Sequence, residues 1–264
     1  MKGFRAVQVL PGVWHIADNM GVCMTLLAGE ERALLVDTGY GLEDVRAFVR
    51  TLTKRPLTVL LTHAHHDHIL GARWFEETCM LEADVRHFAQ YTSACQRSRV
   101  REQALSKGLQ PPDDFLTAPI AQPHPIAPCA MALGGLTAQV IACPGHTPGS
   151  AAVYVPERKL LLTADNWNPC TWLFFDEALP AEAWRENMRS IQKLPFEQVL
   201  CSHQPALYGR SALDEFLAGI TDEALQNAHP VEMGRSVDTR EAFPAPGMNF
   251  VFDWGKSALS GKEK

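Results

Sequence analysis

The chain has 264 residues, of which 46% are hydrophobic and 20% charged, a composition typical of a globular protein with a sizeable core. Its net charge of −6 argues against nucleic acid or an anionic membrane as the main partner. No apolar run approaches the roughly 20 residues that span a bilayer. The seven cysteines form no CxxC pair and the N-terminus lacks the pattern of a secretory signal, so we expect free thiols and a cytoplasmic location.

The first part of the chain has the pattern of a β-sheet followed by a helix. Short apolar runs separated by turn residues predict four strands. Residues 42–52 then carry apolar side chains at helical spacing and predict a helix. The β-forming segment 58–62 predicts a fifth strand, which leads directly into a loop rich in histidine. The four early strands are expected at 7–10, 13–16, 22–27 and 33–36.

Residues 83–130 differ from the rest of the chain, because the segment is helical at first and then rich in proline. A long connection inside a compact domain is usually functional, so the segment is either a lid or pocket wall, or a surface insertion without a role. Within it, Arg97, Arg99 and Arg101 are predicted to form one solvated helix face.

The later part of the chain again mixes strands and helices. Apolar runs predict a further group of strands, and an alternating run at 248–254 predicts an edge strand. With no clear linker, we expect one domain over 1–264, with an insertion at about 83–130 and a short extension after about 230. The other elements are expected as strands at 138–142, 151–155, 160–163 and 198–201 and helices at 181–194 and about 212–226.

The run LTHAHHDHILG places several potential metal ligands just past the fifth predicted strand. His63 and His65 are two residues apart and can point the same way, because strand side chains repeat every second residue. Asp67 and His68 are expected on the following turn, at the start of a helix over 69–77. Such groups would remain unsatisfied if they were buried without a partner, and a divalent cation removes that problem.

Three further donors follow apolar strands later in the chain. His146 lies in the turn CPGHTPGS, Asp165 ends one strand and His203 ends another. Zinc favours imidazole and carboxylate ligands and is held in catalytic sites by three protein groups and a water. The histidine loop could fill one metal site, and these three donors would complete a second.

In this order, HxHxDH, PGHTPGS, a strand-terminal Asp and a strand-terminal His resemble the metallo-β-lactamase superfamily. The LLVDTG strand that contains Asp37 also resembles the family, and the resemblance runs from about Val13 to His203. It implies an α+β fold, a four-layer αββα sandwich with the metal site at one edge of two sheets. Asp37 would orient a ligating imidazole. The implied ligands are His63, His65 and His146 for a first metal, Asp67, His68 and His203 for a second, and Asp165 bridging both.

Several residues near these motifs are not expected to bind metal. His66 fills the variable position between His65 and Asp67, and its side chain should leave on the opposite side. Cys143 and Cys201 are interpreted as buried thiols. The remaining histidines, interpreted as structural or surface residues, are His15, His87, His124 and His229.

The complete ligand set predicts a dinuclear metal-dependent hydrolase in which a metal-bridging hydroxide attacks a small carbonyl substrate, with Asp67 and Asp165 orienting the nucleophile. Zinc is the expected metal, with iron or manganese as alternatives. Lactonases of the family keep all seven ligands, so the resemblance implies a lactone, ester or thioester as the substrate. A glyoxalase II-type thioesterase would carry a basic C-terminal helical domain, which is not evident. The alternatives are a mononuclear iron persulfide dioxygenase-like oxidoreductase and a phosphodiesterase.

Two segments are candidates for the substrate pocket. Residues 17–21 correspond to a family loop that overhangs the site. Residues 166–175 are unusually aromatic and form either a hydrophobic plug under the sheet edge or a pocket wall. A wall of this kind would favour a substrate with an apolar or planar part. The sequence therefore predicts a small-molecule substrate. It does not indicate whether the protein is a monomer or an oligomer.

Overall fold

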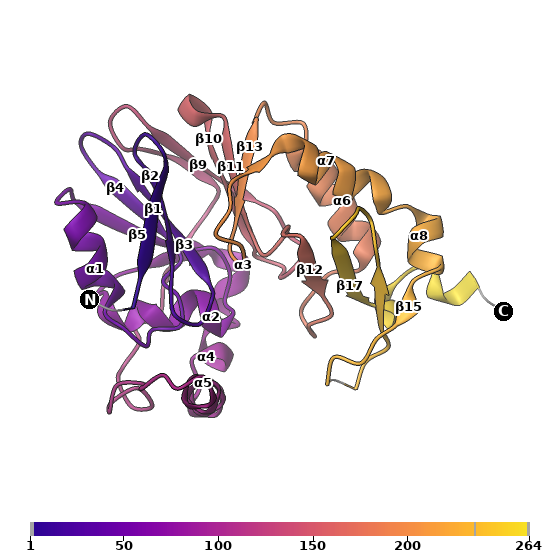
Figure 1. Cartoon of the computed structure of the whole chain (residues 1–264), viewed down its shortest axis with the longest axis horizontal. Coiled ribbons are helices and arrows are strands. Elements are labelled where there is room, and N and C mark those ends of the chain that lie inside the picture. Colours follow the sequence, from indigo (N-terminus) through magenta and orange to yellow (C-terminus); the bar gives the residue numbers. More distant parts are fainter. Residues whose placement is uncertain (1–2, 235, 263–264) are drawn as a thin grey trace.

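Two β-sheets face each other in the middle of the molecule and helices cover their outer faces (Figure 1). The computed structural model describes residues 3–234 and 236–262. The first sheet has the order β1 (Arg5–Leu10), β2 (Val13–Ala17), β3 (Cys23–Ala28), β4 (Ala33–Val36), β5 (Leu57–Leu61), β6 (Cys79–Leu81) and β7 (His124–Ile126). The second has the order β14 (Tyr208–Gly209), β13 (Gln198–Cys201), β11 (Leu160–Ala164), β10 (Ala151–Val155), β9 (Thr137–Ala142) and β8 (Cys129–Ala132).

One buried core lies between the two sheets. Leu34 and Leu60 of the first sheet belong to one buried cluster with Val153, Leu162 and Leu200 of the second. The apolar strand residues that the sequence predicted as buried therefore form one continuous layer. Burying a side chain of this size stabilises the fold by about 1.5–3 kcal/mol relative to exposure.

Helices shield the outer face of each sheet. On the first sheet, α1 (Val45–Leu52) buries Val45 and Val49, in agreement with the predicted helical spacing. On the second sheet, α6 (Ala181–Ile191) and α7 (Arg210–Gly219) pack their apolar faces against the strands. The predicted αββα arrangement is confirmed.

Parallel pairing in both sheets gathers the functional segments at one edge. In the first sheet β4 runs parallel to β5, and in the second β11 runs parallel to β13. Because parallel strands end at the same edge of a sheet, the residues after these four strands are brought together. The two sheets are also joined near this edge, where Ala151 N donates to Thr62 O.

A third, smaller sheet lies on the far side of α6 and α7 (Figure 1). The predicted edge strand at 248–254 corresponds to β17, and the prediction of an edge position is wrong, because β17 pairs on both sides. Its Phe250 and Phe252 are fully buried, and Phe250 packs against Trp184 of α6. The order of this sheet is β12 (Cys170–Leu173), β17 (Asn249–Asp253), β16 (Thr239–Ala242) and β15 (His229–Pro230).

The predicted helix at about 212–226 is two helices, α7 and α8 (Asp222–Gln226). Thr221 separates them and caps α8 by accepting a hydrogen bond from Ala224 N. Gly219 lies so close to the neighbouring chain that a Cβ there would be 1.9 Å from Pro244 O. Tertiary packing therefore ends α7 where local spacing alone predicts a continuous helix.

The helix expected over 69–77 begins three residues earlier, as α2 (His66–Ile69), and continues as the 3-10 segment η1 (Leu70–Trp74). Asp67 and His68 therefore lie on the helix and not on a preceding turn. Gly71 permits a close backbone approach, because a Cβ there would lie 2.0 Å from Thr38 O.

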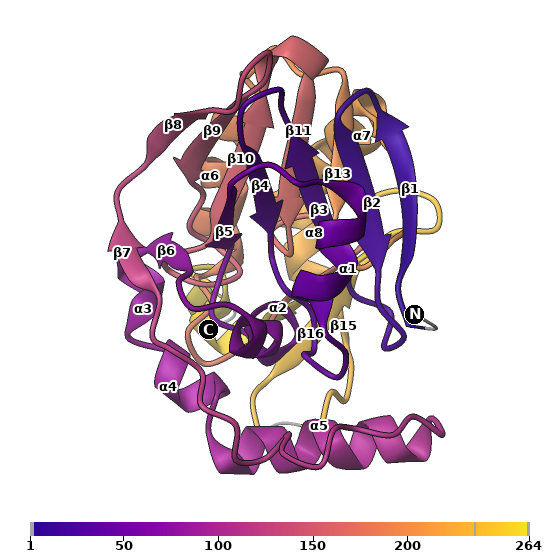
Figure 2. The same ribbon diagram turned by 90° about the vertical axis from the view of Figure 1, so that its left-hand side faces the viewer.

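The segment 83–130 contributes three helices and then returns to the first sheet at β7. Figure 2 shows α5 lying across one end of the molecule. None of the helices in the described part of the chain is long and apolar enough to cross a membrane. The helices of this segment are α3 (Glu82–Val85), α4 (Phe88–Tyr91) and α5 (Ala94–Ser106), and the short 3-10 segments elsewhere are η2 (Pro156–Arg158), η3 (Trp254–Lys256) and η4 (Ser260–Lys262).

Candidate metal centre

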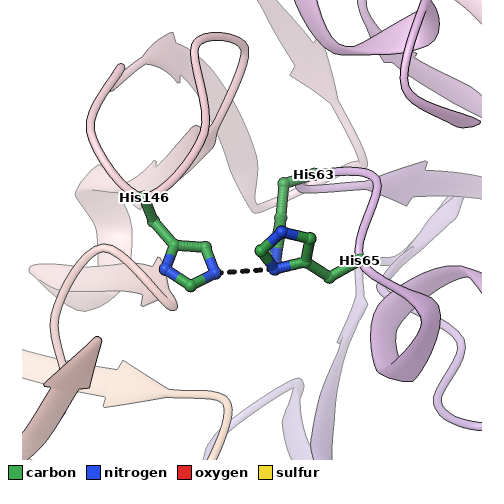
Figure 3. A group of neighbouring side chains, drawn as sticks. All are labelled: His63, His65 and His146. Carbon is green, nitrogen blue, oxygen red and sulfur yellow. Dashed lines mark hydrogen bonds between the residues drawn. The ribbon is translucent and has the colours of Figure 1, made fainter. Parts of the chain in front are cut away.

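The structure brings together all seven residues that the motifs predicted as ligands, in two groups. Within each group the potential ligand atoms lie within 4.8 Å of one another. Each residue follows a strand at the shared edge, lies on α2 or occupies the turn between β9 and β10. The first group is His63, His65 and His146 (Figure 3), and the second is Asp67, His68, Asp165 and His203.

Two nitrogens of the first group face each other in a way that suits a cation between or beside them. His65 Nδ1 and His146 Nε2 are 2.8 Å apart (Figure 3). The other nitrogen of each ring lies next to an acceptor: His65 Nε2 donates to Glu177, and His146 Nδ1 donates to the carbonyl oxygen of Trp172. In neutral rings both facing atoms are therefore lone-pair acceptors.

His63 adds a third lone pair to this group. Its Nδ1 donates to Thr62 Oγ1, which in turn donates to the Asp37 carboxylate. This leaves His63 Nε2 unprotonated, fully buried and without a hydrogen-bond partner. Since buried polar atoms are normally satisfied, this orphaned nitrogen fits a metal ligand.

The second group has two carboxylates and a similar unsatisfied pattern. His68 Nδ1 donates to Asp37 Oδ2 at 2.9 Å, while its Nε2 makes no hydrogen bond and lies 3.4 Å from Asp165 Oδ2. Asp165 Oδ1 is buried and also lacks a partner. His203 Nε2 lies 3.0 Å from Asp165 Oδ2 and 3.5 Å from Asp67 Oδ2. His203 and Asp165 are thus hydrogen-bonded to each other, whereas His68 Nε2 and Asp165 Oδ1 are left without a partner.

The two groups have opposite effects on the charge of their histidines. Burial, together with the neighbouring imidazoles, lowers the pKa of His63 and lowers that of His146 to about 4. Burial also opposes the charged form of His68, but the carboxylates of Asp165, Asp67 and Asp37 outweigh it and raise the pKa. The protein therefore favours the neutral form of His63 and His146, whereas the carboxylates of the second group favour positive charge.

The backbone is strained at two positions beside the second group. Asp37, directly after β4, has φ 67°, and Ala164, directly before Asp165, has φ 48°. Non-glycine residues rarely adopt such angles, which persist only where the surrounding structure enforces them. Here the Asp37 carboxylate accepts from Thr62 N, Thr62 Oγ1 and His68 Nδ1.

Asp84 and Asn166 brace the centre and were missed in the sequence analysis. The fully buried Asp84 accepts from Ala64 N with one oxygen and from Gly149 N with the other, and so ties the histidine loop to the PGHTPGS turn. Asn166 accepts from His146 N and donates to Cys143 O. No motif marks either residue, because their partners are backbone groups distant in sequence.

Glu177 is a third residue that no sequence signal marked. Its Oε1 lies 2.8 Å from His65 Nε2 and also accepts the hydroxyl of Tyr91, which comes from α4. Burial opposes ionisation of Glu177, but the hydrogen bond and the charge of His65 lower its pKa to about 2. A carboxylate in this position fixes the tautomer of a ligating imidazole.

A cavity of about 570 Å³ opens over both donor groups. One wall comes from α4 and α5, so the segment 83–130 is a pocket wall and not a surface insertion without a role. The aromatic stretch serves both purposes that the sequence suggested. Trp167 is buried in the core against Phe216, whereas Trp172 and Phe175 line the cavity.

The other predicted residues lie outside both donor groups. His66 is not part of either group, but contrary to expectation its half-buried side chain lines the same cavity. Cys143 and Cys201 are buried thiols, as expected, and burial raises the pKa of each to about 12. His15 is buried and hydrogen-bonded to Thr25 and Gln204, while His87, His124 and His229 are partly or fully exposed.

The loop at 17–21 does not line this cavity. Asp18, Asn19 and Met20 line a separate and much smaller cavity of about 50 Å³. Asp18 holds the loop by accepting hydrogen bonds from Met20 N, Gly21 N and Val22 N. The expected overhang is therefore wrong for the cavity over the donors.

The three arginines of α5 do not form one solvated face, because residues two apart on a helix point in different directions. Arg97 is buried and donates to Thr92 O and Ala118 O. Arg99 lines the cavity over the donor groups, and Arg101 is exposed elsewhere on α5.

The fold and site define an α+β sandwich protein with clustered histidine and carboxylate donors at the shared sheet edge. The chain belongs to the metallo-beta-lactamase superfamily, whose family model matches residues 20–203. It is similar in fold to a metallo-beta-lactamase family protein from Thermus thermophilus, with a TM-score of 0.61, 22% identity and coverage of 83% of this chain and 82% of that one.

Curated relatives include two kinds of thioester hydrolase. A hydroxyacylglutathione hydrolase of Rhodobacter capsulatus is 35% identical over 161 residues, which are 59% of this chain and 51% of the relative. An acyl-coenzyme A thioesterase of Gallus gallus is 25% identical over 156 residues, 53% of this chain and 55% of the relative. The chain spans about half the length of these relatives.

Proposed function

We propose that the protein is a metal-dependent hydrolase of thioesters and that its seven donors hold two divalent metal ions. His63, His65 and His146 would bind the first ion, and Asp67, His68 and His203 the second, with Asp165 shared between them. The observation that carries this proposal is the convergence of unsatisfied buried atoms, namely His63 Nε2, His68 Nε2 and Asp165 Oδ1. Three imidazoles in one group and two carboxylates in the other suit zinc, with iron or manganese as alternatives.

Of the lactones, esters and thioesters expected from the sequence, thioesters are the substrate class that we prefer. The curated relatives are named for hydrolysis of acylglutathione and acyl-coenzyme A, both of which are thioesters. The cavity volume of about 570 Å³ suits a small organic molecule. Aromatic side chains on its wall, Trp172 and Phe175, suit the apolar part of an acyl group.

Bound divalent ions lower the pKa of a water molecule and polarise a carbonyl group. Asp67 and Asp165 line the cavity, and their carboxylates can accept a hydrogen bond from the attacking water and orient it. The water oxygen bonds to the acyl carbon, and the carbon–sulfur bond breaks. A proton released from the water is carried by one of these carboxylates to the sulfur, which leaves as a thiol beside the free acid.

Metal content and activity together test this function. We expect wild type to contain two metal ions per chain by elemental analysis and to hydrolyse thioesters faster than lactones, phosphodiesters or β-lactams. His63→Ala and Asp165→Ala should each lower kcat by at least about 10³-fold, because each removes a donor from the centre. Circular dichroism should show that the fold is retained.

A control substitution far from the donors, Asp113→Asn, should leave metal content and kcat unchanged. Wild-type activity in either donor variant would contradict the proposal. A firm stoichiometry of one iron per chain would instead favour the mononuclear oxygenase alternative. The cytoplasmic location and the absence of nucleic-acid partners stay predictions.

A further inference from the structure

One face of α5 forms part of the cavity wall over the donor groups. Gln96, Arg99, Val100 and Gln103 all line the cavity, and their spacing of three, one and three residues places them on one side of a helix. At 1.5 Å per residue this face extends for about 10 Å. It offers two amides and a guanidinium beside the cavity, and the side chains of Arg99 and Gln103 are also exposed to solvent.

The position of α5 is fixed, so this face is a built part of the pocket. Ser93 caps the helix by accepting from Gln96 N. On another side of the helix, the buried Arg97 donates to Ala118 O at 2.6 Å. Val100 also packs in a small apolar cluster with Leu70 and Phe115. The helix backbone that carries these polar side chains is therefore fixed beside the cavity.

Arg99 is the one lysine or arginine among the residues that line this cavity. In the described part of the chain it makes no hydrogen bond or ion pair, although Arg97 of the same helix is fully engaged. The carboxylates on the cavity lining, Asp67 and Asp165, belong to the donor groups and face histidines. Arg99 is exposed to solvent at this cavity, and a guanidinium without a protein partner there suits a carboxylate or phosphate on the ligand.

We propose that this face of α5 binds the thiol-carrier half of the substrate, an amide-bearing chain that ends in an anionic group. Arg99 pairs with the carboxylate or phosphate, and Gln96 and Gln103 exchange hydrogen bonds with the amides of the carrier. The acyl half then lies toward the aromatic side chains of Trp172 and Phe175. This inference rests on the proposed thioesterase function and specifies its substrate class.

Two carriers share this chemistry, namely glutathione, with peptide bonds and carboxylates, and coenzyme A, with amides and phosphates. A set of three thioesters with the same acyl group separates them, the third being the neutral N-acetylcysteamine thioester. Arg99→Gln should raise KM about tenfold for the carrier that the protein uses and leave kcat nearly unchanged. For the neutral carrier, KM should change by less than about threefold.

Arg101→Gln is the matched control, because Arg101 is on the same helix and exposed but does not line the cavity. It should leave KM unchanged for all three thioesters. Calorimetric titration with the S-alkyl thioethers of glutathione and coenzyme A provides a readout without turnover. Arg99→Gln should weaken binding of the preferred thioether about tenfold relative to wild type and to Arg101→Gln.

The possible failures are distinguishable. If wild type hydrolyses none of the three thioesters, the proposed function fails and the inference falls with it. If wild type hydrolyses a thioester but Arg99→Gln affects charged and neutral carriers equally, or affects neither, only the inference is overturned.

Discussion

The two donor groups are held by carboxylates from different parts of the fold. In the second group His68 is held by Asp37, which lies directly after β4 and is 1% exposed. In the first group His65 is held by Glu177, which comes from the loop after β12 and is itself held by Tyr91 of the pocket wall. Asp37 is thus part of the sandwich core, whereas Glu177 belongs to the segments that form the pocket.

This difference predicts that the two groups respond differently to loss of their supporting carboxylate. Changes at Asp37 should disturb both the fold and the second metal, because its carboxylate also satisfies buried groups of Thr62. Changes at Glu177 should disturb the first metal with little effect on the fold. The first group is therefore coupled to the pocket wall through Glu177 and to the core only indirectly, through Thr62 and His63, whereas the second group is held by the core directly.

The largest effect is expected for Asp37→Asn. Asparagine tolerates the positive φ of this position but replaces one acceptor oxygen by a donor, so Thr62 or His68 loses its partner. We expect the free energy of unfolding of the metal-free protein to fall by about 1–3 kcal/mol. Affinity for one of the two metals should fall about 10–100-fold.

Urea unfolding and competition with a chromophoric chelator measure these two quantities, with the exposed Asp113→Asn as the control. Unchanged stability together with unchanged metal affinity would show that Asp37 does not support the second group.

A smaller effect is expected for Glu177→Gln. The amide oxygen can still accept from His65 and Tyr91, so only the negative charge is lost. We expect affinity for one metal to fall about tenfold, the free energy of unfolding to change by less than about 1 kcal/mol, and kcat to fall in proportion to metal loss. Chelator challenge followed by elemental analysis should show that one metal leaves before the other.

The exposed Glu186→Gln on α6 serves as the control for this substitution. Excess zinc should restore kcat in Glu177→Gln, because a positioning residue acts through the metal. Activity that stays low at full metal occupancy would contradict this role.

The smallest effect is expected for the dependence of stability on pH that His15 causes. The His15 side chain supports the chain next to His203 through its hydrogen bond to Gln204 O. Burial lowers the pKa of His15 below its ordinary value of 6.5. The unfolded chain therefore binds a proton more readily than the folded one. The stabilisation by His15 is complete above about pH 6.5 and is lost as the pH falls below it.

The comparison of wild type with His15→Gln isolates this contribution. Between pH 7.5 and 5.5, metal-free wild type should lose more stability than His15→Gln in urea unfolding. Equal losses would show that His15 does not contribute to the pH dependence.

Much of the metal centre could be predicted from sequence, because each donor lies in a local pattern. His63 and His65 follow an apolar strand at a spacing of two, and Asp165 and His203 end strands of the same kind. Parallel pairing then places these strand ends at one edge, which strand patterns and motif order together imply. Asp37 could be found in the same way, because it belongs to a recognisable strand motif.

The pocket could not be predicted to the same depth. Glu177, Asp84 and Asn166 act on partners that are distant in sequence, and a single carboxylate or amide carries no local signal of its partner. The same reason explains why β17 was expected at an edge. Its alternation predicts a strand, but its neighbours, β12 and β16, come from separate segments of the chain.

The sequence by itself determined the family, the two-sheet sandwich and the seven donors, since all of these depend on residue type and short spacing. Only the tertiary structure decided which side chains hold the donors in place and which face of α5 borders the cavity. Arg97, Arg99 and Arg101 show this most clearly. They are alike in sequence, and packing alone makes Arg97 a buried brace and leaves the other two exposed, with only Arg99 beside the cavity.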